Sequence, residues 1–324
     1  MRPNIASLSV LCCLPITLLA QSARQEKTIN LPAGGSVEAV SVSPAGNLIA
    51  AICSDHVVRI WSMRSGELLR SFKEEGGQPG VQFSGDGRLL AVSYEIIAYE
   101  KGTIKVFDVD SWEVQNDLTS ECMYCALAFS PDSRRLASAG NSGVSVWDLA
   151  ARKKVATISP PFGGSPALAF SPDGKLVATA DGDGFVRVHD ASTGALRATA
   201  TEFLMEPLAV AFSPDGKSVL AGGADKAVSI IDSETGKVAR VLPKQSGVVS
   251  SLDVSRDGNR AAVVYHSAES FLEENHVILW DLEKGTVLAD FQKPGIVMIG
   301  GAFVRDHYVL AATSANQLTL WSLP

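Results

Sequence analysis

The stretch from Ser165 to Thr199 alternates short apolar runs with turn residues. Ala167–Phe170 and Leu176–Ala180 are apolar, Phe185–His189 alternates apolar and polar positions, and Ala195–Thr199 forms a fourth run. The separating segments are rich in Asp, Gly, Ser and Pro. Pro cannot donate to a sheet ladder, and Gly accepts the positive φ of a tight turn. The pattern predicts a four-stranded antiparallel meander, which needs neighbouring sheets because it cannot bury both of its faces alone.

Two features of this stretch recur along the chain. The spacing of about 41 to 49 residues is that of propeller blades or comparable repeats. The first turn, at 171–174, has counterparts at 43–46, 84–87, 130–133, 213–216 and 255–258. A degenerate copy of the same turn lies at 304–307. The end of the third strand, at His189, has counterparts at Trp61, Phe107, Trp147, Ile231, Trp280 and Trp321.

A Ser-Pro-Asp-Gly turn, an apolar strand, an Asp- or Gly-bearing turn and a strand ending in Trp-Asp together resemble the WD40 repeat. The resemblance covers residues 27–324. It implies an all-β fold, a seven-bladed β-propeller of four-stranded antiparallel blades, and a role in binding other proteins. The Gly-His pair that precedes each blade in the family is missing. The family's His–Ser/Thr–Asp–Trp hydrogen-bond network is therefore not expected to form, and the chain is expected to be a divergent member.

The ends of the repeat predict how the ring closes. Residues 27–32 resemble fourth strands such as 237–243, whereas Leu318–Ser322 is a third strand with no fourth strand after it. We therefore expect the N-terminal strand to complete the last blade, which removes an exposed sheet edge. The domain prediction is a single propeller over 27–324, forming a monomeric ring.

Residues 1–23 have a different composition. Arg2 is followed by an apolar run, Ile5–Ala20, and then by polar residues, which is typical of a secretory signal peptide cleaved near Ala20 or Ala23. The alternative is an uncleaved anchor, but about 16 apolar residues are short for a membrane span. We expect an exported, secreted protein, periplasmic or extracellular, with no membrane insertion after cleavage. The chain has no Asn-x-Ser/Thr sequon, which favours a bacterial source.

The cysteines and acidic turns do not predict a metal or cofactor. Cys122 and Cys125 have CxxC spacing, but one such pair is a weak metal signal. A small disulfide and two buried apolar thiols are both open readings. The turn at 181–184 superficially resembles a calcium loop but lacks the remaining ligands. We expect no metal and no cofactor.

The chain carries a formal net charge of −7, which disfavours nucleic acid as a partner. It has no GxSxG, HExxH or GxxxxGK[ST] motif, and the histidines do not converge along the sequence. His189 occupies a Trp register and is expected to pack within a blade. We therefore predict no catalysis. The alternative is a propeller enzyme, such as a lactonase-like hydrolase, in which at least three ionisable groups would converge at a channel mouth.

Two long connections, 94–101 and 265–275, fall on the rim opposite the Ser-Pro-Asp-Gly turns, where loops on a rigid scaffold commonly carry function. Aromatic residues gather there as well, although each could instead cover the end of a blade. Acidic neighbours favour a basic or amphipathic protein or peptide partner. The predicted partner-binding residues are Tyr94, Tyr99, Tyr124, Phe162, Phe203, Met205 and Phe271. The flanking acidic residues are Glu95, Glu100, Glu202, Glu206, Glu273 and Glu274.

Overall fold

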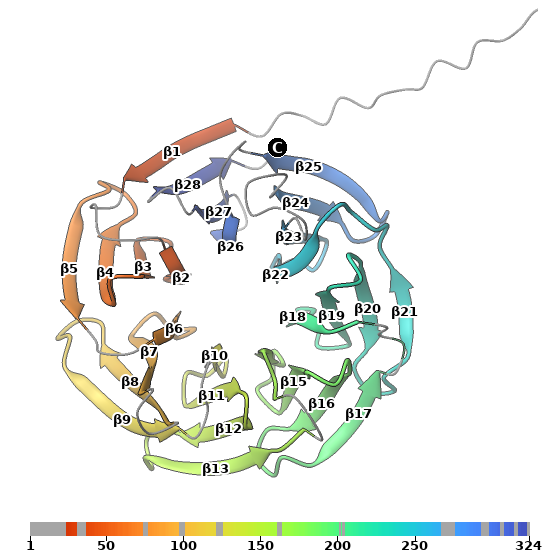
Figure 1. Ribbon diagram of the computed structural model, residues 1–324, viewed down its shortest axis with the longest axis horizontal. Coiled ribbons are helices and arrows are strands. Elements are labelled where there is room, and N and C mark those ends of the chain that lie inside the picture. The colour runs from red at the N-terminus through yellow and green to blue at the C-terminus, as the bar shows by residue number, and fades with distance from the viewer. Residues whose placement is uncertain are drawn as a thin grey trace, which may run out of the picture.

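The strands of the protein form a ring of antiparallel sheets around a central opening (Figure 1). The computed structural model describes residues 24–30, 37–73, 77–96, 101–120, 126–160, 164–200, 202, 205–266, 276–292, 298–304, 308–313 and 317–322. Within these residues the chain builds seven four-stranded sheets. The all-β propeller with four-stranded antiparallel blades is confirmed.

The blades follow one another in chain order. Blade 1 holds β2 (Val37–Val42), β3 (Leu48–Cys53), β4 (Val57–Ser62) and β5 (Leu68–Lys73), and blade 2 holds β6 (Gly77–Phe83), β7 (Leu89–Ile96), β8 (Lys101–Asp108) and β9 (Val114–Ser120). Blade 3 holds β10 (Ala126–Phe129), β11 (Arg135–Gly140), β12 (Gly143–Asp148) and β13 (Lys153–Ile158), and blade 4 holds β14 (Ala167–Phe170), β15 (Leu176–Ala180), β16 (Val186–Asp190) and β17 (Leu196–Ala200). Blade 5 holds β18 (Pro207–Phe212), β19 (Ser218–Gly223), β20 (Val228–Asp232) and β21 (Val238–Val241), and blade 6 holds β22 (Val248–Val254), β23 (Arg260–His266), β24 (His276–Asp281) and β25 (Thr286–Gln292). Blade 7 holds β26 (Met298–Val304), β27 (Tyr308–Thr313), β28 (Gln317–Ser322) and β1 (Arg24–Asn30).

The first strand of the chain completes blade 7 as its outermost strand. β1 pairs antiparallel with β28, with Arg24 opposite Ser322 and Ile29 opposite Leu318. Figure 1 shows β1 beside β28 at the junction of the two ends of the strand order. The predicted closure of the ring by the N-terminal strand is confirmed.

The Ser-Pro-Asp-Gly turns are built by one repeated set of contacts. In blade 4 the Ser171 hydroxyl donates to Asp173 (2.7 Å) and accepts from the backbone N–H of Leu176 (2.9 Å). The first of these bonds holds the pKa of Asp173 below its usual range. Gly174 has φ 70°, a conformation that a side chain would strain. The same serine–aspartate bond recurs at Ser84 and Asp86, Ser130 and Asp132, Ser213 and Asp215, and Ser255 and Asp257.

Adjacent turns also contact each other around the ring. A Cβ built on Gly174 would lie 3.5 Å from the ring of Pro131 in the preceding blade, and one on Gly216 would lie 3.5 Å from Pro172. The proline of one turn therefore lies against the glycine of the next turn. Gly87 with Pro44, and Gly258 with Pro214, repeat this contact.

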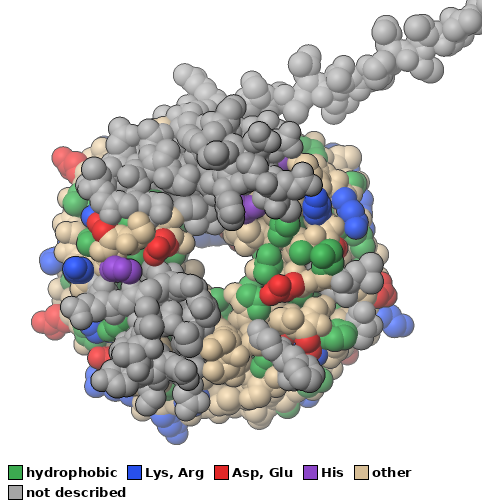
Figure 2. All heavy atoms as spheres, viewed as in Figure 1, with side chains coloured by type: hydrophobic (Ala, Val, Ile, Leu, Met, Phe, Trp, Pro, Cys, Tyr) green, Lys and Arg blue, Asp and Glu red, His purple; other side chains and the backbone are tan. Residues whose placement is uncertain are grey.

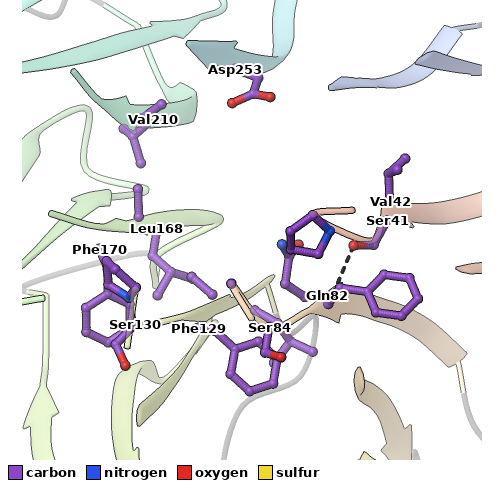
Figure 3. Close-up of a pocket in the computed structure, with 18 of the residues that line it drawn as sticks. Ser41, Val42, Gln82, Ser84, Phe129, Ser130, Leu168, Phe170, Val210 and Asp253 are labelled. Carbon is purple, nitrogen blue, oxygen red and sulfur yellow. Dashed lines mark hydrogen bonds between the residues drawn. The ribbon is translucent and has the colours of Figure 1, made fainter. Parts of the chain in front are cut away.

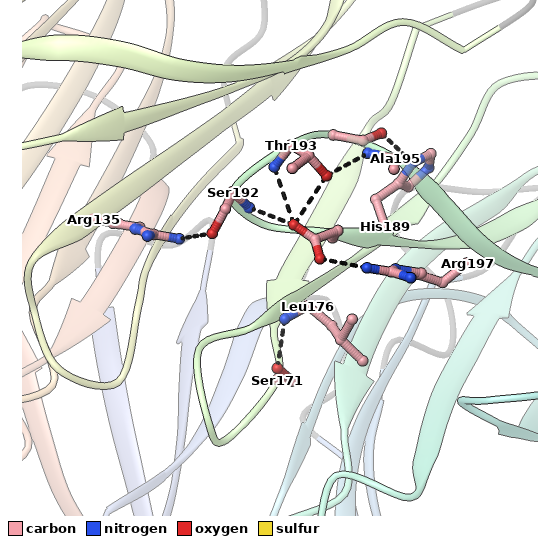
Figure 4. Close-up of polar contacts among 10 residues, drawn as sticks. Arg135, Ser171, Leu176, His189, Ser192, Thr193, Ala195 and Arg197 are labelled. Carbon is pink, nitrogen blue, oxygen red and sulfur yellow. Dashed lines mark hydrogen bonds and ion pairs between the residues drawn. The ribbon is translucent and has the colours of Figure 1, made fainter.

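The turn between the third and fourth strands of a blade is organised by the aspartate that ends the third strand. In blade 4 one carboxylate oxygen of Asp190 accepts from the backbone N–H groups of Ser192 and Thr193, both at 3.0 Å. The other accepts from the Arg197 guanidinium at 2.8 Å, as the contacts in Figure 4 illustrate. These bonds lower the pKa of Asp190, and they explain why Asp follows the Trp register in most repeats.

The Trp register supplies the core of the blades. Trp61 and Trp280 are 1% exposed and Trp147 is 8% exposed, so each is a packing residue, as predicted. His189 at the same register is also buried and binds the Gly194 carbonyl through Nδ1 at 3.2 Å. Between blades, apolar side chains of one sheet pack on the next; Val188 and Phe212, for example, belong to one cluster.

The expectation that the Trp–Asp network cannot form is too strong. The Trp147 indole N–H donates to the Ser138 hydroxyl at 3.3 Å in blade 3. In blade 4 a serine before the first strand, Ser165, donates to Asp181 at 2.6 Å. Part of the network therefore forms without the family's histidine.

Several sequence predictions lie outside the described residues. The signal segment 1–23 and the Cys122–Cys125 pair are among them, and both stay predictions. Cys53 is described; its thiol is buried, and burial raises its pKa. No helix in the described parts of the chain is long and apolar enough to cross a membrane.

Candidate interaction face

One face of the ring carries the turns between the second and third strands of each blade and the connections between blades. We call it the loop face; its described members include Ser54–His56, Asp181–Gly184, Ala224–Ala227 and the connection residues Met205 and Glu206. The opposite face carries the Ser-Pro-Asp-Gly turns. Figure 2 shows the central opening between the blades.

Blade 4 contributes a rigid charged turn to the loop face. Asp181 is 1% exposed and accepts from Ser165 (2.6 Å) and from Nη1 of Arg187 (2.6 Å). Arg187 also donates to both carboxylate oxygens of Asp183, at 2.9 and 2.7 Å. The Phe185 ring lies 4.9 Å from the guanidinium carbon. One arginine thus joins two carboxylates and an aromatic ring, a geometry suited to its planar fork.

These contacts shift the pKa values of Arg187 and Asp183. Hydrogen bonds to Asp183 and Asp181 raise the pKa of Arg187, and the same guanidinium holds the pKa of Asp183 below its usual range. The ionised forms of Arg187 and Asp183 are therefore each favoured by the other.

Two other blades place a cation at the same position, two residues before the Trp register. Arg59 in blade 1 donates to both oxygens of Asp55, at 2.9 and 2.5 Å. Lys105 in blade 2 lies 5.3 Å from the centre of the Tyr94 ring. These cations are therefore engaged within the protein rather than presented to a partner.

The connection between blades 4 and 5 presents an apolar side chain between acidic ones. Met205 is 52% exposed, and Glu202 and Glu206 are exposed on either side of it. The Glu206 carbonyl accepts from the backbone N–H of Ala224 at 3.1 Å, and Gly223 approaches so closely that a Cβ there would collide with the same carbonyl. The backbone of Glu206 is thus fixed to the neighbouring turn of blade 5.

The structure places two of the seven predicted partner-binding residues. Met205 is exposed as predicted, and Tyr94 lies partly buried at the loop-face end of β7, opposite Thr103. The other five, Tyr99, Tyr124, Phe162, Phe203 and Phe271, lie outside the described residues.

The sequence prediction missed the Asp181–Asp183–Arg187–Phe185 group. Its signal was present, because Arg187 is a charged residue in the middle of an otherwise apolar strand. Arg59 stands at the equivalent place, four residues after Asp55 as Arg187 stands four after Asp183. A charge in that position needs a nearby partner of opposite sign.

The channel contains a cavity of about 510 Å³ toward the Ser-Pro-Asp-Gly face (Figure 3). Its wall is made by inner strands, and the backbone N–H of Phe83 donates across one blade junction to the Ser41 hydroxyl at 3.0 Å. Asp253 is the one ionisable side chain among its described lining residues. The described lining therefore does not bring together the three ionisable groups that a channel-mouth hydrolase would need. Among the described residues no group of three His, Cys, Asp or Glu could hold a metal.

Comparison with known proteins identifies the repeats. The family model described as "WD domain, G-beta repeat" matches residues 25–62, 119–148, 155–190 and 206–232. These four segments match the WD40 repeat. The matched segments correspond to β1–β4 and to strands of blades 2 to 5, including the Ser-Pro-Asp-Gly turns of blades 3 to 5.

Parts of the chain are also similar to curated proteins. It is 42% identical over 76 residues to "Eukaryotic translation initiation factor 3 subunit I" of Coccidioides immitis, covering 23% of this chain and 22% of the relative. It is 28% identical over 146 residues to the protein of the same name in Bombyx mori, covering 40% and 43%. It is 30% identical over 129 residues to "Periodic tryptophan protein 2 homolog" of Mus musculus, covering 39% and 14%. The match thus spans less than half the length of each relative, and their eukaryotic sources give no support to the predicted bacterial source.

Proposed function

We propose that this WD40-repeat protein is a scaffold that binds a protein or peptide partner through its loop face. WD40 propellers generally bind proteins, and two of the similar relatives are named as subunits of a larger factor. The observation that carries the choice of face is Met205, an exposed apolar side chain that directly precedes Glu206, whose carbonyl is hydrogen-bonded to the backbone of Ala224.

The chemistry of the residues around Met205 supports one kind of partner. Exposed apolar side chains in fixed positions serve as anchors for pockets on a partner. The surrounding carboxylates attract a positively charged surface and speed encounter, an effect that salt weakens. The partner proposed is therefore a basic, amphipathic segment, with an apolar residue for Met205 and Lys or Arg for the glutamates.

Export is a second part of the proposal. Residues 1–23 have the composition of a signal peptide, so the propeller is proposed to act outside the cytosol. Expression of the full chain with and without residues 1–23, followed by fractionation and N-terminal sequencing, tests this. Cleavage after Ala20 or Ala23 supports export, whereas an intact N-terminus in the cytosolic fraction contradicts it.

Binding is tested with peptides selected from a random displayed library on the full chain and then titrated calorimetrically. Met205→Ser is expected to weaken binding about 30-fold, which corresponds to about 2 kcal/mol for an interface anchor. The matched control is Leu196→Ser, because Leu196 is 55% exposed but lies on β17, the outer strand of blade 4. Equal affinities for Met205→Ser and the parent chain, or a loss only with Leu196→Ser, would move the site off the loop face.

A further inference from the structure

Ser246, His276 and Asp290 form a line of hydrogen bonds in blade 6. The Ser246 hydroxyl lies 3.2 Å from Nε2 of His276, and Nδ1 of the same ring lies 3.2 Å from a carboxylate oxygen of Asp290. The two ring nitrogens thus contact a hydroxyl on one side and a carboxylate on the other. This is the order of contacts in which a histidine activates a serine, and it is recognised by geometry rather than by sequence position.

The three side chains come from separate elements that hold them in place. Asp290 lies on β25, opposite Ile278 of β24, and His276 is the first residue of β24. Ser246 lies in the connection between β21 and β22. This connection is tied to blade 5 by the N–H of Leu242 on the Val228 carbonyl (2.8 Å). It is tied again by the N–H of Gln245 on the Lys226 carbonyl (3.1 Å).

The surroundings of the line differ at its two ends. His276 is only 7% exposed, and the Tyr265 ring packs edge-on against it with centroids 6.2 Å apart, so the imidazole is held in one orientation. Ser246 is exposed, so the serine end of the line lies at the protein surface. At the other end, the Asp290 side chain is 36% exposed, so the carboxylate that contacts the imidazole also contacts solvent.

The backbone after Ser246 completes the arrangement. A Cβ on Gly247 would collide with the backbone of His266, so only glycine fits directly after the serine. Within the described part of the chain, the N–H groups of Ser246 and Gly247 have no hydrogen-bond acceptor. Free N–H groups beside a nucleophile can stabilise the oxyanion that forms when it attacks a carbonyl.

We propose that Ser246, His276 and Asp290 form an esterase site on the loop face, an activity separate from partner binding. Ser246 Oγ attacks the ester carbonyl carbon while its proton passes to Nε2 of His276. The bond from that carbon to the alkoxy oxygen then breaks, and His276 returns the proton to the leaving alcohol. Water next attacks the acyl-serine and gives its proton to His276, and the carboxylic acid leaves as Ser246 regains its hydrogen.

The substrate class follows from the exposure of the site. A partly exposed Asp290 stabilises the imidazolium less than a buried carboxylate would, because water screens the charge pair. Esters with good leaving groups are therefore favoured over amides. Ser246 is exposed rather than enclosed, which favours a short acyl chain over one that needs an apolar tunnel.

The test uses the full chain, a fluorophosphonate probe and p-nitrophenyl acetate. The probe is expected to attach to Ser246, as located by peptide mass spectrometry. Ser246→Ala is expected to lower kcat/KM for the ester at least 100-fold. Ser159→Ala is the matched control, because Ser159 is also exposed but lies just after β13, and it should leave both readouts unchanged.

Asp290 acts through His276 and is a positioning residue, so its variant needs its own readout. Asp290→Asn is expected to lower kcat about tenfold or more while KM stays the same, since Asp290 orients the base and touches no substrate. Melting curves for each variant establish that the blade is intact. The proposal is overturned by an unlabelled parent chain, by labelling at another residue, or by equal hydrolysis in the parent and Ser246→Ala chains.

Discussion

The charged turn of blade 4 gives a quantitative test of how the loop face is held together. Arg187→Met keeps most of the side-chain length but removes the guanidinium that bonds Asp181 and Asp183. Asp181, at 1% exposed, would keep the Ser165 hydroxyl as its side-chain donor, beside a second carboxylate. Breaking a buried ion pair by removing one partner costs about 3–5 kcal/mol, because the remaining charge is left uncompensated.

That cost translates into a measurable melting shift. The unfolding entropy is about 2.1 cal/mol/K per residue, so a propeller of about 300 residues gains about 0.6 kcal/mol/K on unfolding. A loss of 3–5 kcal/mol therefore lowers Tm by about 5–8 °C. The matched control is Arg197→Met, because the Arg197–Asp190 pair in the same blade is exposed on the arginine side. Exposed pairs contribute about 0–1 kcal/mol, and this variant should shift Tm by less than 2 °C.

The pH dependence has a definite sign. In the parent chain Arg187 lowers the pKa of Asp183, so the ionised carboxylate adds to the free energy of unfolding. This stabilisation is fully present above the unfolded pKa of about 3.9, and it is lost as the pH falls through the lower folded pKa. In Arg187→Met the Asp183 carboxylate loses this hydrogen bond, so it binds a proton more readily in the folded state than it does in the parent chain. The Tm difference between the two chains should therefore narrow from pH 7 to pH 4. Calorimetry at several pH values measures it; a shift below 2 °C at pH 7, or one that does not change with pH, refutes the reasoning.

Two further predictions concern the ring. Trp147→Ala removes a buried indole and its bond to Ser138, and should cost about 3–5 kcal/mol in calorimetry while leaving peptide affinity unchanged; an unaltered Tm would contradict its packing role. Deleting residues 24–30 removes β1 and exposes the edge of β28, so light scattering should detect concentration-dependent association. A monomeric, equally stable deletion variant would contradict the closure.

The fold could be predicted from the sequence because its signals are local and repeated. The turn at 171–174 needs Ser, Asp and Gly within four residues, and the Asp190 turn is equally compact. Such turns can be predicted from the sequence because the residues in contact lie within a few positions of one another. The ring closure followed from counting strands, since the last blade had three and needed a fourth.

The functional groups were harder to predict because their members meet only in the folded chain. Ser246 and His276 are 30 positions apart, and His276 and Asp290 are 14 apart. No motif marks such spacing, and the histidines gave no convergence along the sequence. The Arg187 group was closer in sequence, but Ser165 reaches it from the preceding connection. In each case it was strand pairing and packing between blades that brought the side chains together.

The pairing of β1 with β28 also determines how the ring responds to force. Arg24 and Ser322 face each other at one end of the antiparallel pair, and Asn30 and Gln317 at the other. Tension applied at Arg24 and Ser322 loads the ladder from one end, so its hydrogen bonds break one after another rather than all at once. A partner or fused domain that pulls on these two positions would separate β1 from β28. The other three strands of blade 7 would stay paired at that point. The seam that closes the ring is thus loaded in the unzipping direction when force acts at Arg24 and Ser322.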